Sequence, residues 1–597
     1  MRWTKIVALA AAGSLSLAAC GGGSDKGGGS SDNATSGGGS QTVALDPTAK
    51  GPAPAVDGAK TGGTLTVPYN AVPETFDPTR DYYQDTDAIM SQLVTRSLTA
   101  YRVGKEGKPV LVPDLAEDLG TQSDGGLTWT FKLKPNMKYS DGSTIKAADF
   151  VYSIKRSFDT ADYPDGPAAN YGFQYYKNFP DPSAEKQADN VYTGPYTGKD
   201  ANFTTAEAPN DTTLVVHLKK KWPTFPYYAA FPVMSPIPQA KDTKANYGNN
   251  PIASGPYMFD SYTVGSELKL KKNPNWDPNS DPVRHQFVDA YDFKFGVDIV
   301  PNQTAIIASN GTAATSLNFD GVDSSLISKV SGAGASNADQ LVVGPDPCVT
   351  YATIDSRSVP LEVRKAYAVA YPIDQLRKAT GETTLSFTPA TTYGSANIPG
   401  FEAYAPVNGL TGKGNGDPAK AKEMLAAAGK TGFKISYYYS NNDPTAVAAN
   451  SVKKQALTAA GFTVQDVGVS KTDLRKKRNL TDGSVNTGQG PRGWCYDWPA
   501  NDSVYPQIFT SAAIGASISV GMLKDPALDA QIDAIAVLPI DQQQAKWNTL
   551  DKEIAEKYLP AVPLDYGRAN LLFGKQVHNV INDPNRGMPD FAQIWVG

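Results

Sequence analysis

The first twenty residues constrain this chain most, because they decide in which compartment the rest of it folds. Arg2 and Lys5 form a short basic start, and Ile6 to Ala19 is a run of small and apolar residues. This run is too short to cross a hydrocarbon core about 30 Å thick, for which a helix needs about 20 residues. Its order is that of a secretory signal rather than of a membrane anchor. We expect residues 1–19 to be a signal peptide and the remainder to fold outside the cytoplasm.

The residues around Cys20 indicate how the chain is held there. Leu-Ala-Ala-Cys at 17–20 resembles the lipobox of bacterial lipoproteins, in which the cysteine receives a diacylglycerol. The alternative is an ordinary cleavage site with an incidental cysteine. From Gly21 to Gly63 the chain is rich in Gly and Ser and has almost no large apolar residue, so it cannot offset the entropy of ordering. We expect residues 20–63 to be a lipidated cysteine and a flexible linker that hold the protein at the extracellular face of the cell membrane.

Beyond the linker the composition is that of a soluble globular protein. Hydrophobic residues make up 40% and charged residues 19% of the chain. The part from about Thr64 to Gly597 is long enough for two or three domains. No later apolar run approaches the roughly 18 residues of a membrane span. The formal charge of -5 and the lack of a Lys/Arg block make a nucleic-acid partner unexpected.

The three cysteines are Cys20, Cys348 and Cys495. Because Cys20 is assigned to lipid, two thiols remain in an oxidising compartment, where pairing is the default expectation. Such a bridge would close a long loop, for which the chain-entropy model gives about 4 to 5 kcal/mol. Two separately buried free thiols are the alternative.

Apolar periodicity predicts a mixed α/β fold. The elements predicted in the first half are strands over 64–67 and 127–133 and helices over 89–98 and 150–158. On the last of these helices the apolar residues share one face, and Lys155 and Arg156 are expected to point outward. Further on, the predicted elements are helices over 360–370 and 418–428, a strand over 433–440, a helix over 449–460 and a strand over 462–467. The last three form a βαβ unit, which implies a parallel strand pair.

Catalytic patterns are missing from the sequence. His217, His285 and His578 are far apart, and none belongs to an H-E-x-x-H pair. C-x-x-C, G-x-S-x-G and the two phosphate-binding glycine patterns are absent as well. We therefore expect no enzyme, no cofactor and no metal site, although a glycosidase's paired carboxylates are invisible to the sequence and leave a hydrolase as an alternative.

Tyrosine clusters suggest a roomy ligand cavity or, alternatively, ordinary packing. They are Tyr175-Tyr176, Tyr227-Tyr228 and Tyr437-Tyr438-Tyr439. Tyrosine supplies apolar area with a polar handle, which suits both uses. Composition does not separate them.

Short stretches in a fixed order carry a family resemblance. They are Gly62–Leu65, Thr75–Pro78, Pro113–Asp118, Thr128–Lys134, Asp141–Val151, Ser254–Tyr257, Leu270–Pro274, Val363–Ala366, Ile373–Asp374 and Gly493–Trp498. Each is unspecific alone, but their order and spacing resemble the extracytoplasmic solute-binding proteins of ABC importers. The resemblance is to the peptide-binding group, bacterial solute-binding protein family 5, which includes oligopeptide- and dipeptide-binding proteins.

The resemblance implies a periplasmic-binding-protein-like α/β fold of two lobes with an extra inserted domain. Three domains would close on the ligand by a hinge. The implied boundaries are 62–97, 250–347 and 563–597 for domain I, 98–249 for domain II and 348–562 for domain III. The implied partners are an ABC permease and ATPase, and we expect a monomer.

The resemblance also assigns site residues. In oligopeptide-binding members the aspartate of the G-W-C-x-D segment anchors the peptide α-ammonium, which matches Asp497 here. A desolvated ammonium needs such a carboxylate, because its burial otherwise costs more than the attraction returns. The cysteine of that segment, Cys495, would pair with Cys348 and hold Asp497 in place. A local turn or capping role is the alternative for Asp497.

Other positions match ligand contacts of the family. They are Gly493, Trp494, Cys495 and Tyr351, with Val72 and Tyr566 as weaker alignments. The chain lacks the tryptophan that some members carry in the stretch matching 464–470. No arginine can be assigned to a ligand carboxylate, so ligand length stays open.

The resulting expectation is a lipid-anchored subunit of an ABC importer that captures short peptides between two lobes and delivers them to a membrane permease. The alternatives are an extracellular receptor for a peptide signal with the same fold, or a binder of a non-peptide solute.

Overall fold

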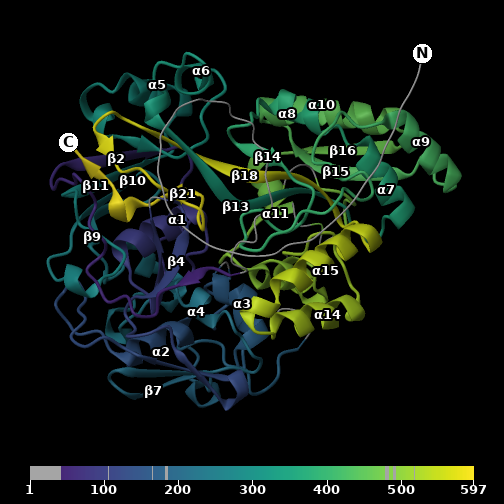
Figure 1. Ribbon diagram of the computed structural model, residues 1–597. Coiled ribbons are helices and arrows are strands. Elements are labelled where there is room, and N and C mark those ends of the chain that lie inside the picture. Colours follow the sequence, from purple (N-terminus) through teal and green to yellow (C-terminus); the bar gives the residue numbers. More distant parts are fainter. Residues whose placement is uncertain are drawn as a thin grey trace, which may run out of the picture. The chain divides into compact units, whose positions relative to one another are not determined.

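The computed structural model describes residues 42–597, except 105, 165, 182–183, 185, 478–479, 481–482, 489–491 and 517 (Figure 1). The predicted signal peptide, the predicted lipidation at Cys20 and the linker up to residue 41 lie outside the described residues. In the part that is described, no helix is long and apolar enough to cross a membrane.

Residues 42–63 correct the predicted linker, because they lie on the folded body. β1 (Ala44–Leu45) pairs in parallel with β4 (Pro109–Pro113). The side chains of Val43 and Ala53 are buried. The composition of this stretch is that of a linker. The open edge of β4 nevertheless supplies hydrogen-bond partners for the backbone of Ala44 and Leu45. Few large apolar residues are needed when a neighbouring strand satisfies the backbone.

The first sheet is formed by segments far apart in the chain. Its strand order is β2-β11-β10-β9, with β2 parallel to β11. The bounds are β2 Thr64–Tyr69, β9 Tyr257–Thr263, β10 Glu267–Lys272 and β11 Ala290–Phe295. The helix predicted over 89–98 starts earlier: α1 spans Gln84–Ile89 and continues as a π-helical turn over Met90–Val94. Its buried residues Ile89 and Leu93 pack with the sheet.

The second sheet, β5-β6-β8-β7, covers an aromatic core. The elements here are β5 Thr121–Ser123, β6 Thr128–Lys132, β7 Ala206–Asn210, β8 Thr213–His217, α2 Ala147–Arg156, α3 Pro167–Tyr175 and α4 Phe225–Tyr228. β3 (Thr99–Val103) belongs to a separate small sheet, where it pairs antiparallel with β4. Tyr175 stacks on Trp222 with ring centroids 4.1 Å apart, and Tyr176, Tyr227 and Tyr228 are buried beside them. For these two tyrosine pairs packing is the role that the structure shows.

The third region contains the central sheet of the molecule. Long strands β13 (Leu341–Thr353) and β18 (Ala561–Phe573) lie side by side and antiparallel (Figure 1). β12 (Leu317–Asn318) and β14 (Phe387–Pro389) pair with β18, and β17 (Arg492–Cys495) pairs with β13. The surrounding helices are α5 Ile299–Ala308, α6 Ile327–Val330, α7 Leu361–Ala370, α8 Ile373–Thr380, α9 Pro418–Ala427, α11 Lys471–Lys477, α12 Tyr505–Ile508, α13 Ser511–Gly515, α14 Pro526–Ala536 and α15 Gln544–Lys557. Short C-terminal strands are β19 Val577–His578, β20 Asn582–Asp583, β21 Met588–Pro589 and β22 Trp595–Val596.

The predicted βαβ unit is confirmed. β15 (Lys434–Ser440) and β16 (Thr463–Val469) are parallel, and α10 (Pro444–Ala459) connects them. The helix begins earlier than the predicted 449–460, because the Asp443 carboxylate accepts the backbone N–H groups of Thr445 and Ala446 and so caps it.

The predicted outward orientation of Arg156 is wrong. Its side chain is fully buried and forms two hydrogen bonds to Asp77, at 2.6 and 2.8 Å, and one to Asp242 at 3.1 Å. The hydroxyls of Thr79 and Tyr163 accept further bonds from the guanidinium. The helix therefore carries a charged side chain on a buried face, because three other segments bring partners for every donor group.

Candidate functional site

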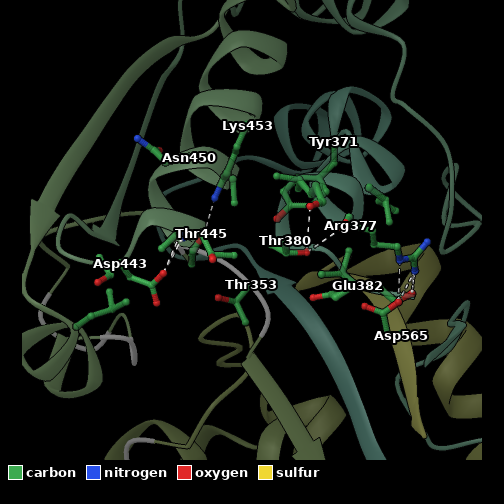
Figure 2. A pocket seen from close by; sticks show the side chains of 18 of the residues that line it. Thr353, Tyr371, Arg377, Thr380, Glu382, Asp443, Thr445, Asn450, Lys453 and Asp565 are labelled. Atoms are coloured by element: carbon green, nitrogen blue, oxygen red, sulfur yellow. Dashed lines mark hydrogen bonds and ion pairs between the residues drawn. The ribbon is translucent and has the colours of Figure 1, made fainter. Parts of the chain in front are cut away.

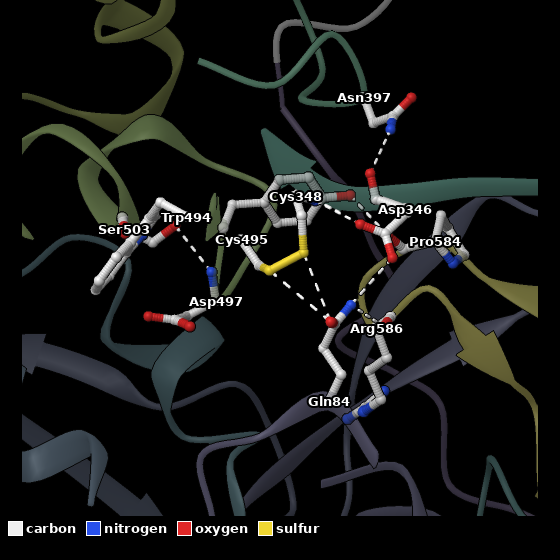
Figure 3. Close-up of a disulfide and its surroundings, with 11 residues drawn as sticks. Gln84, Asp346, Cys348, Asn397, Trp494, Cys495, Asp497, Ser503, Pro584 and Arg586 are labelled. Atoms are coloured by element: carbon white, nitrogen blue, oxygen red, sulfur yellow. Dashed lines mark hydrogen bonds between the residues drawn. A yellow bond between two sulfur atoms is a disulfide. The ribbon is translucent and has the colours of Figure 1, made fainter. Parts of the chain in front are cut away.

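The disulfide joins β13 to β17 through the two cysteines that the resemblance pairs. Cys348 of β13 stands opposite Cys495 of β17, and Val349 stands opposite Trp494 in the same antiparallel ladder. The two cysteines are bonded (Figure 3), so the predicted pair is confirmed and the alternative of two free thiols is wrong. The bridge fixes the segment that leads to Asp497.

Asp497 lies two residues beyond the bridge and contacts two tyrosines from other parts of the chain. Its Oδ2 accepts a hydrogen bond from the hydroxyl of Tyr82 at 2.7 Å and another from the hydroxyl of Tyr171. Its backbone N–H donates to Ser503 Oγ at 3.2 Å (Figure 3). Tyr82 precedes α1, whereas Tyr171 belongs to α3. The carboxylate therefore connects three segments that are distant in sequence.

Burial raises the pKa of Asp497 to about 7, although the hydrogen bonds from Tyr171 and Tyr82 oppose the rise. A positive group placed beside the carboxylate would favour its ionised form and lower that pKa. The cavity next to it measures only about 10 Å³ and is lined in part by Phe231 and Arg586. This is about the space of one water molecule. In this conformation Asp497 has the chemistry of an ammonium acceptor but no room for a ligand.

A much larger cleft lies on the other side of the bridge. Its volume is about 440 Å³, within the range of small-ligand sites. The lining residues are Tyr69, Ala71, Val72, Glu74, Tyr83, Gln84, Asp85, Phe319, Asp320, Gly321, Asp346, Ser386, Arg568, Ala569, Asn570, Gly587 and Met588. We call this space the bridge cleft. It includes the predicted contact Val72, whose side chain is 52% exposed.

Gln84 connects the bridge cleft to the disulfide. Its Nε2 donates to Asp346 Oδ2 at 3.2 Å and to the carbonyl of Arg586 at 2.5 Å. Its Oε1 lies 3.5 Å from Cys348 Sγ, a contact rather than a hydrogen bond because a disulfide sulfur carries no proton (Figure 3). The cleft wall and the bridge are therefore one packed unit.

The remaining predicted contacts occupy different places. Gly493 is exposed and pairs with Thr350, and the half-buried Trp494 donates its Nε1–H to the Ser503 carbonyl at 3.0 Å. Tyr351 is buried, and its hydroxyl donates to the carbonyl of Tyr393.

Tyr566 is buried as well. Its hydroxyl lies 2.6 Å from Thr392 Oγ1. Neither Tyr351 nor Tyr566 lines the bridge cleft or the small cavity at Asp497. Their ligand contacts stay predictions, and in this conformation both side chains pack into the core.

A second wide cavity, also of about 440 Å³, lies between α8, α10 and the central sheet (Figure 2). Lys453 Nζ donates to the Gly488 carbonyl at 2.7 Å and lies 3.8 Å from the ring centre of Tyr437, and burial lowers its pKa to about 7. Arg377 and Asp565 form a buried ion pair at the other end of the cavity. Its lining residues fall between 353 and 565, and all of them belong to predicted domain III except Leu564 and Asp565, which lie in the last segment of predicted domain I.

Sequence reasoning missed Gln84 and Asp346. Gln84 lies in a stretch with no motif, and only its folded position brings it to the bridge. Asp346 stands two residues before Cys348, so a polar residue beside a predicted bridge cysteine was a usable signal. Across the described residues no group of three or more His, Cys, Asp or Glu side chains is arranged to hold a metal ion.

Comparison with known proteins decides the family. The model for bacterial extracellular solute-binding proteins, family 5, matches residues 110–516. The chain belongs to this family. Its members are substrate-binding proteins of ABC importers that work outside the cytoplasm and are not enzymes, so the hydrolase alternative falls away.

Individual relatives of this solute-binding protein are distant. It is 25% identical to the glutathione-binding protein GsiB of Escherichia coli O1:K1 over 428 residues, which are 71% of this chain and 73% of that protein. Among solved structures, a clavulanic acid biosynthesis oligopeptide binding protein aligns with a TM-score of 0.77 and 22% identity over 94% of this chain and 99% of the other.

The Escherichia coli murein tripeptide binding protein MppA gives a TM-score of 0.69 and 18% identity over 90% of this chain and 98% of that one. These structures share the two-lobed, mixed α/β fold, so the predicted fold class is confirmed.

Proposed function

We propose that this solute-binding protein captures short peptides in the bridge cleft and delivers them to a membrane permease. The observation that carries the proposal is the disulfide-fixed ladder of β13 and β17 beside a cleft of about 440 Å³. Support also comes from the relatives, whose names specify glutathione, oligopeptides and a murein tripeptide as their ligands. All three ligand classes contain peptide bonds.

The proposal includes the three-domain division and hinge closure. Under the boundaries expected from the resemblance, Tyr82 belongs to domain I, Tyr171 to domain II and Asp497 to domain III. The hydrogen bonds among these three side chains would then form only when the domains are closed. A ligand stabilises that closed form by its differential affinity for it. Asp497 would hold the peptide α-ammonium once the tyrosine hydroxyls make room.

The N-terminal features complete the proposal. A signal peptide over 1–19, lipidation at Cys20 and the remaining linker would hold a monomeric protein at the extracellular face of the membrane. A lipid anchor at one residue leaves the folded body able to turn between capture and delivery.

Titration calorimetry tests the capture of peptides. The full chain is titrated with alanine peptides of two to five residues, with glucose and with a metal chelate. We expect saturable binding of at least one peptide length and none of the sugar or the chelate. Binding of the sugar or chelate with no peptide binding would reject the proposal.

The pKa of Asp497 gives a pH prediction. If Asp497 holds the ammonium, affinity for a free-amine peptide should rise about fivefold between about pH 6 and about pH 7.5, because the carboxyl ionises there while the peptide amine keeps most of its proton. An N-acetylated peptide should show no such rise, and Asp497→Asn should flatten the profile. Calorimetry at several pH values measures it, and an unchanged rise in Asp497→Asn would contradict the role.

In the ligand-free protein, the contribution of Asp497 to the free energy of unfolding falls as the pH rises, whereas its contribution to peptide affinity increases. Because the folded-state pKa of Asp497 lies above the unfolded value, its contribution to stability is complete below about pH 4 and is lost as the pH rises through about 7. Ligand affinity and unliganded stability should therefore change in opposite directions over this range.

A further inference from the structure

The bridge cleft is lined by an excess of acidic side chains. Its carboxylate residues are Glu74, Asp85, Asp320 and Asp346, and Arg568 is the cationic residue among the lining. Arg568 directs its Nη1 to the carbonyl of Thr384, at 2.9 Å. A cleft with walls of one sign concentrates the field inside it and attracts counter-charges.

Asp346 is held in the cleft wall by close packing. Its Oδ1 accepts the backbone N–H of Cys348 at 2.8 Å, and its Oδ2 accepts Gln84 Nε2 at 3.2 Å. A Cβ on Gly567 would come within 2.6 Å of Oδ1, and one on Gly587 within 2.2 Å of Oδ2. The carboxylate therefore fits into this space only because residues 567 and 587 are both glycine.

Asp346 and Asp320 both bear a desolvation cost. Burial raises the pKa of each carboxyl, and the groups that oppose the rise are hydrogen-bond donors rather than cations. Asp320 accepts from Asn318 Nδ2 at 2.8 Å and from the backbone N–H of Asn70 at 3.0 Å. No ion pair within the described ranges involves either carboxylate. A cation in the cleft would offset the cost of keeping them ionised.

An independent observation comes from Asn570, which lines the same cleft and is 3% exposed. Its Nδ2 donates to the carbonyls of Leu385 and Arg568, at 3.1 and 3.2 Å. Its Oδ1 is buried without a hydrogen-bond partner among the residues that the structure describes. A buried acceptor of this kind costs about 1 to 3 kcal/mol, and a ligand N–H group that reached it would remove that cost.

We propose that the bridge cleft recognises a positively charged group of the ligand, an ammonium or a guanidinium, with Asp346 as its principal acceptor. The inference rests on the proposed function, because it specifies the class of peptide that the cleft takes. The charged group has two possible sources, and the shared chemistry is an N–H donor with a full positive charge. It is a lysine or arginine side chain if Asp497 holds the α-ammonium, and the N-terminal amine if Asp497 does not. Such donors form hydrogen bonds about twice as strong as neutral ones.

Calorimetry on the full chain with four tripeptides separates the sources. They are Ala-Lys-Ala, Ala-norleucine-Ala and the N-acetylated form of each. Norleucine removes the side-chain charge, and acetylation removes the charge of the N-terminal amine. The substitution that removes the charge recognised by the cleft should weaken binding about tenfold or more. Added salt should reduce the difference, because screening weakens attraction between charges.

Asp346→Asn keeps the shape of the side chain and should remove most of the preference for the charged peptide. Asp541→Asn is the matched control, since Asp541 is exposed and does not line the cleft. Asp320→Asn is the second test variant, used if Asp346→Asn fails to fold by circular dichroism, and we expect a smaller loss in the same direction.

The outcomes distinguish the inference from the function beneath it. Equal binding of charged and neutral peptides, or a preference that survives in the Asp346→Asn and Asp320→Asn variants, would overturn the inference and leave peptide capture standing. Failure of all four peptides to bind, where alanine peptides of other lengths also fail, would overturn the proposed function and this inference with it.

Discussion

Replacing Cys348 and Cys495 together by serine is expected to lower the free energy of unfolding by about 2 to 5 kcal/mol. The bridge joins residues 147 positions apart, so its loss releases a long loop in the unfolded chain. In the folded state, loss of the bridge removes a restraint on the segment carrying Asp497 and on the cleft wall formed by Gln84 and Asp346. Denaturant titration of the double variant measures the first effect, and peptide affinity by calorimetry should fall with it.

The wild-type chain treated with a reductant is the control for this prediction. Its unfolding midpoint should match that of the double variant, because both lack the bridge. A double variant that unfolds at the same denaturant concentration as the oxidised wild type would show that the bridge contributes nothing to stability.

Replacing Arg156 by methionine is expected to cost about 3 to 5 kcal/mol. The substitution keeps an apolar side chain of similar length, but it leaves Asp77 and Asp242 without the guanidinium that faces them. Buried carboxylates that lose their counter-ion must protonate or admit water, and both are unfavourable at neutral pH. Thermal and denaturant unfolding would detect the loss.

The matched control is Arg102→Met. Arg102 pairs with Asp46 at 3.1 Å, and both side chains are partly exposed. Pairs of this kind contribute about 0 to 1 kcal/mol, so the same chemical change should have a small effect there. Equal losses from the two substitutions would reject the idea that burial makes the Arg156 network important.

The sequence predicted correctly those helices and strands that depend on patterns within a short stretch of the chain. The parallel pair β15 and β16 and the helix α9, which begins at Pro418 under its cap Asp417, follow from alternation, helical spacing and capping residues. The bridge between Cys348 and Cys495 followed from compartment and cysteine number, with the resemblance agreeing.

Arrangements that depend on distant segments could not be predicted in this way. Arg156 has the sequence context of an exposed helical residue, and only the folded chain brings Asp77 and Asp242 to it. Likewise, nothing local shows that Gly567 and Gly587 leave space for the Asp346 carboxylate. The stretch 42–63 has the composition of a linker, and nothing local in its sequence shows that Ala44 and Leu45 pair with the edge of β4.

The central claim is that the cleft beside the bridge holds a peptide, and mass spectrometry of the bound ligand tests it most directly. The full-length protein is purified from its own cells without denaturation, and the ligand is released in acid and sequenced. We predict short peptides that carry at least one positive charge. A non-peptide solute released in stoichiometric amount would contradict the account.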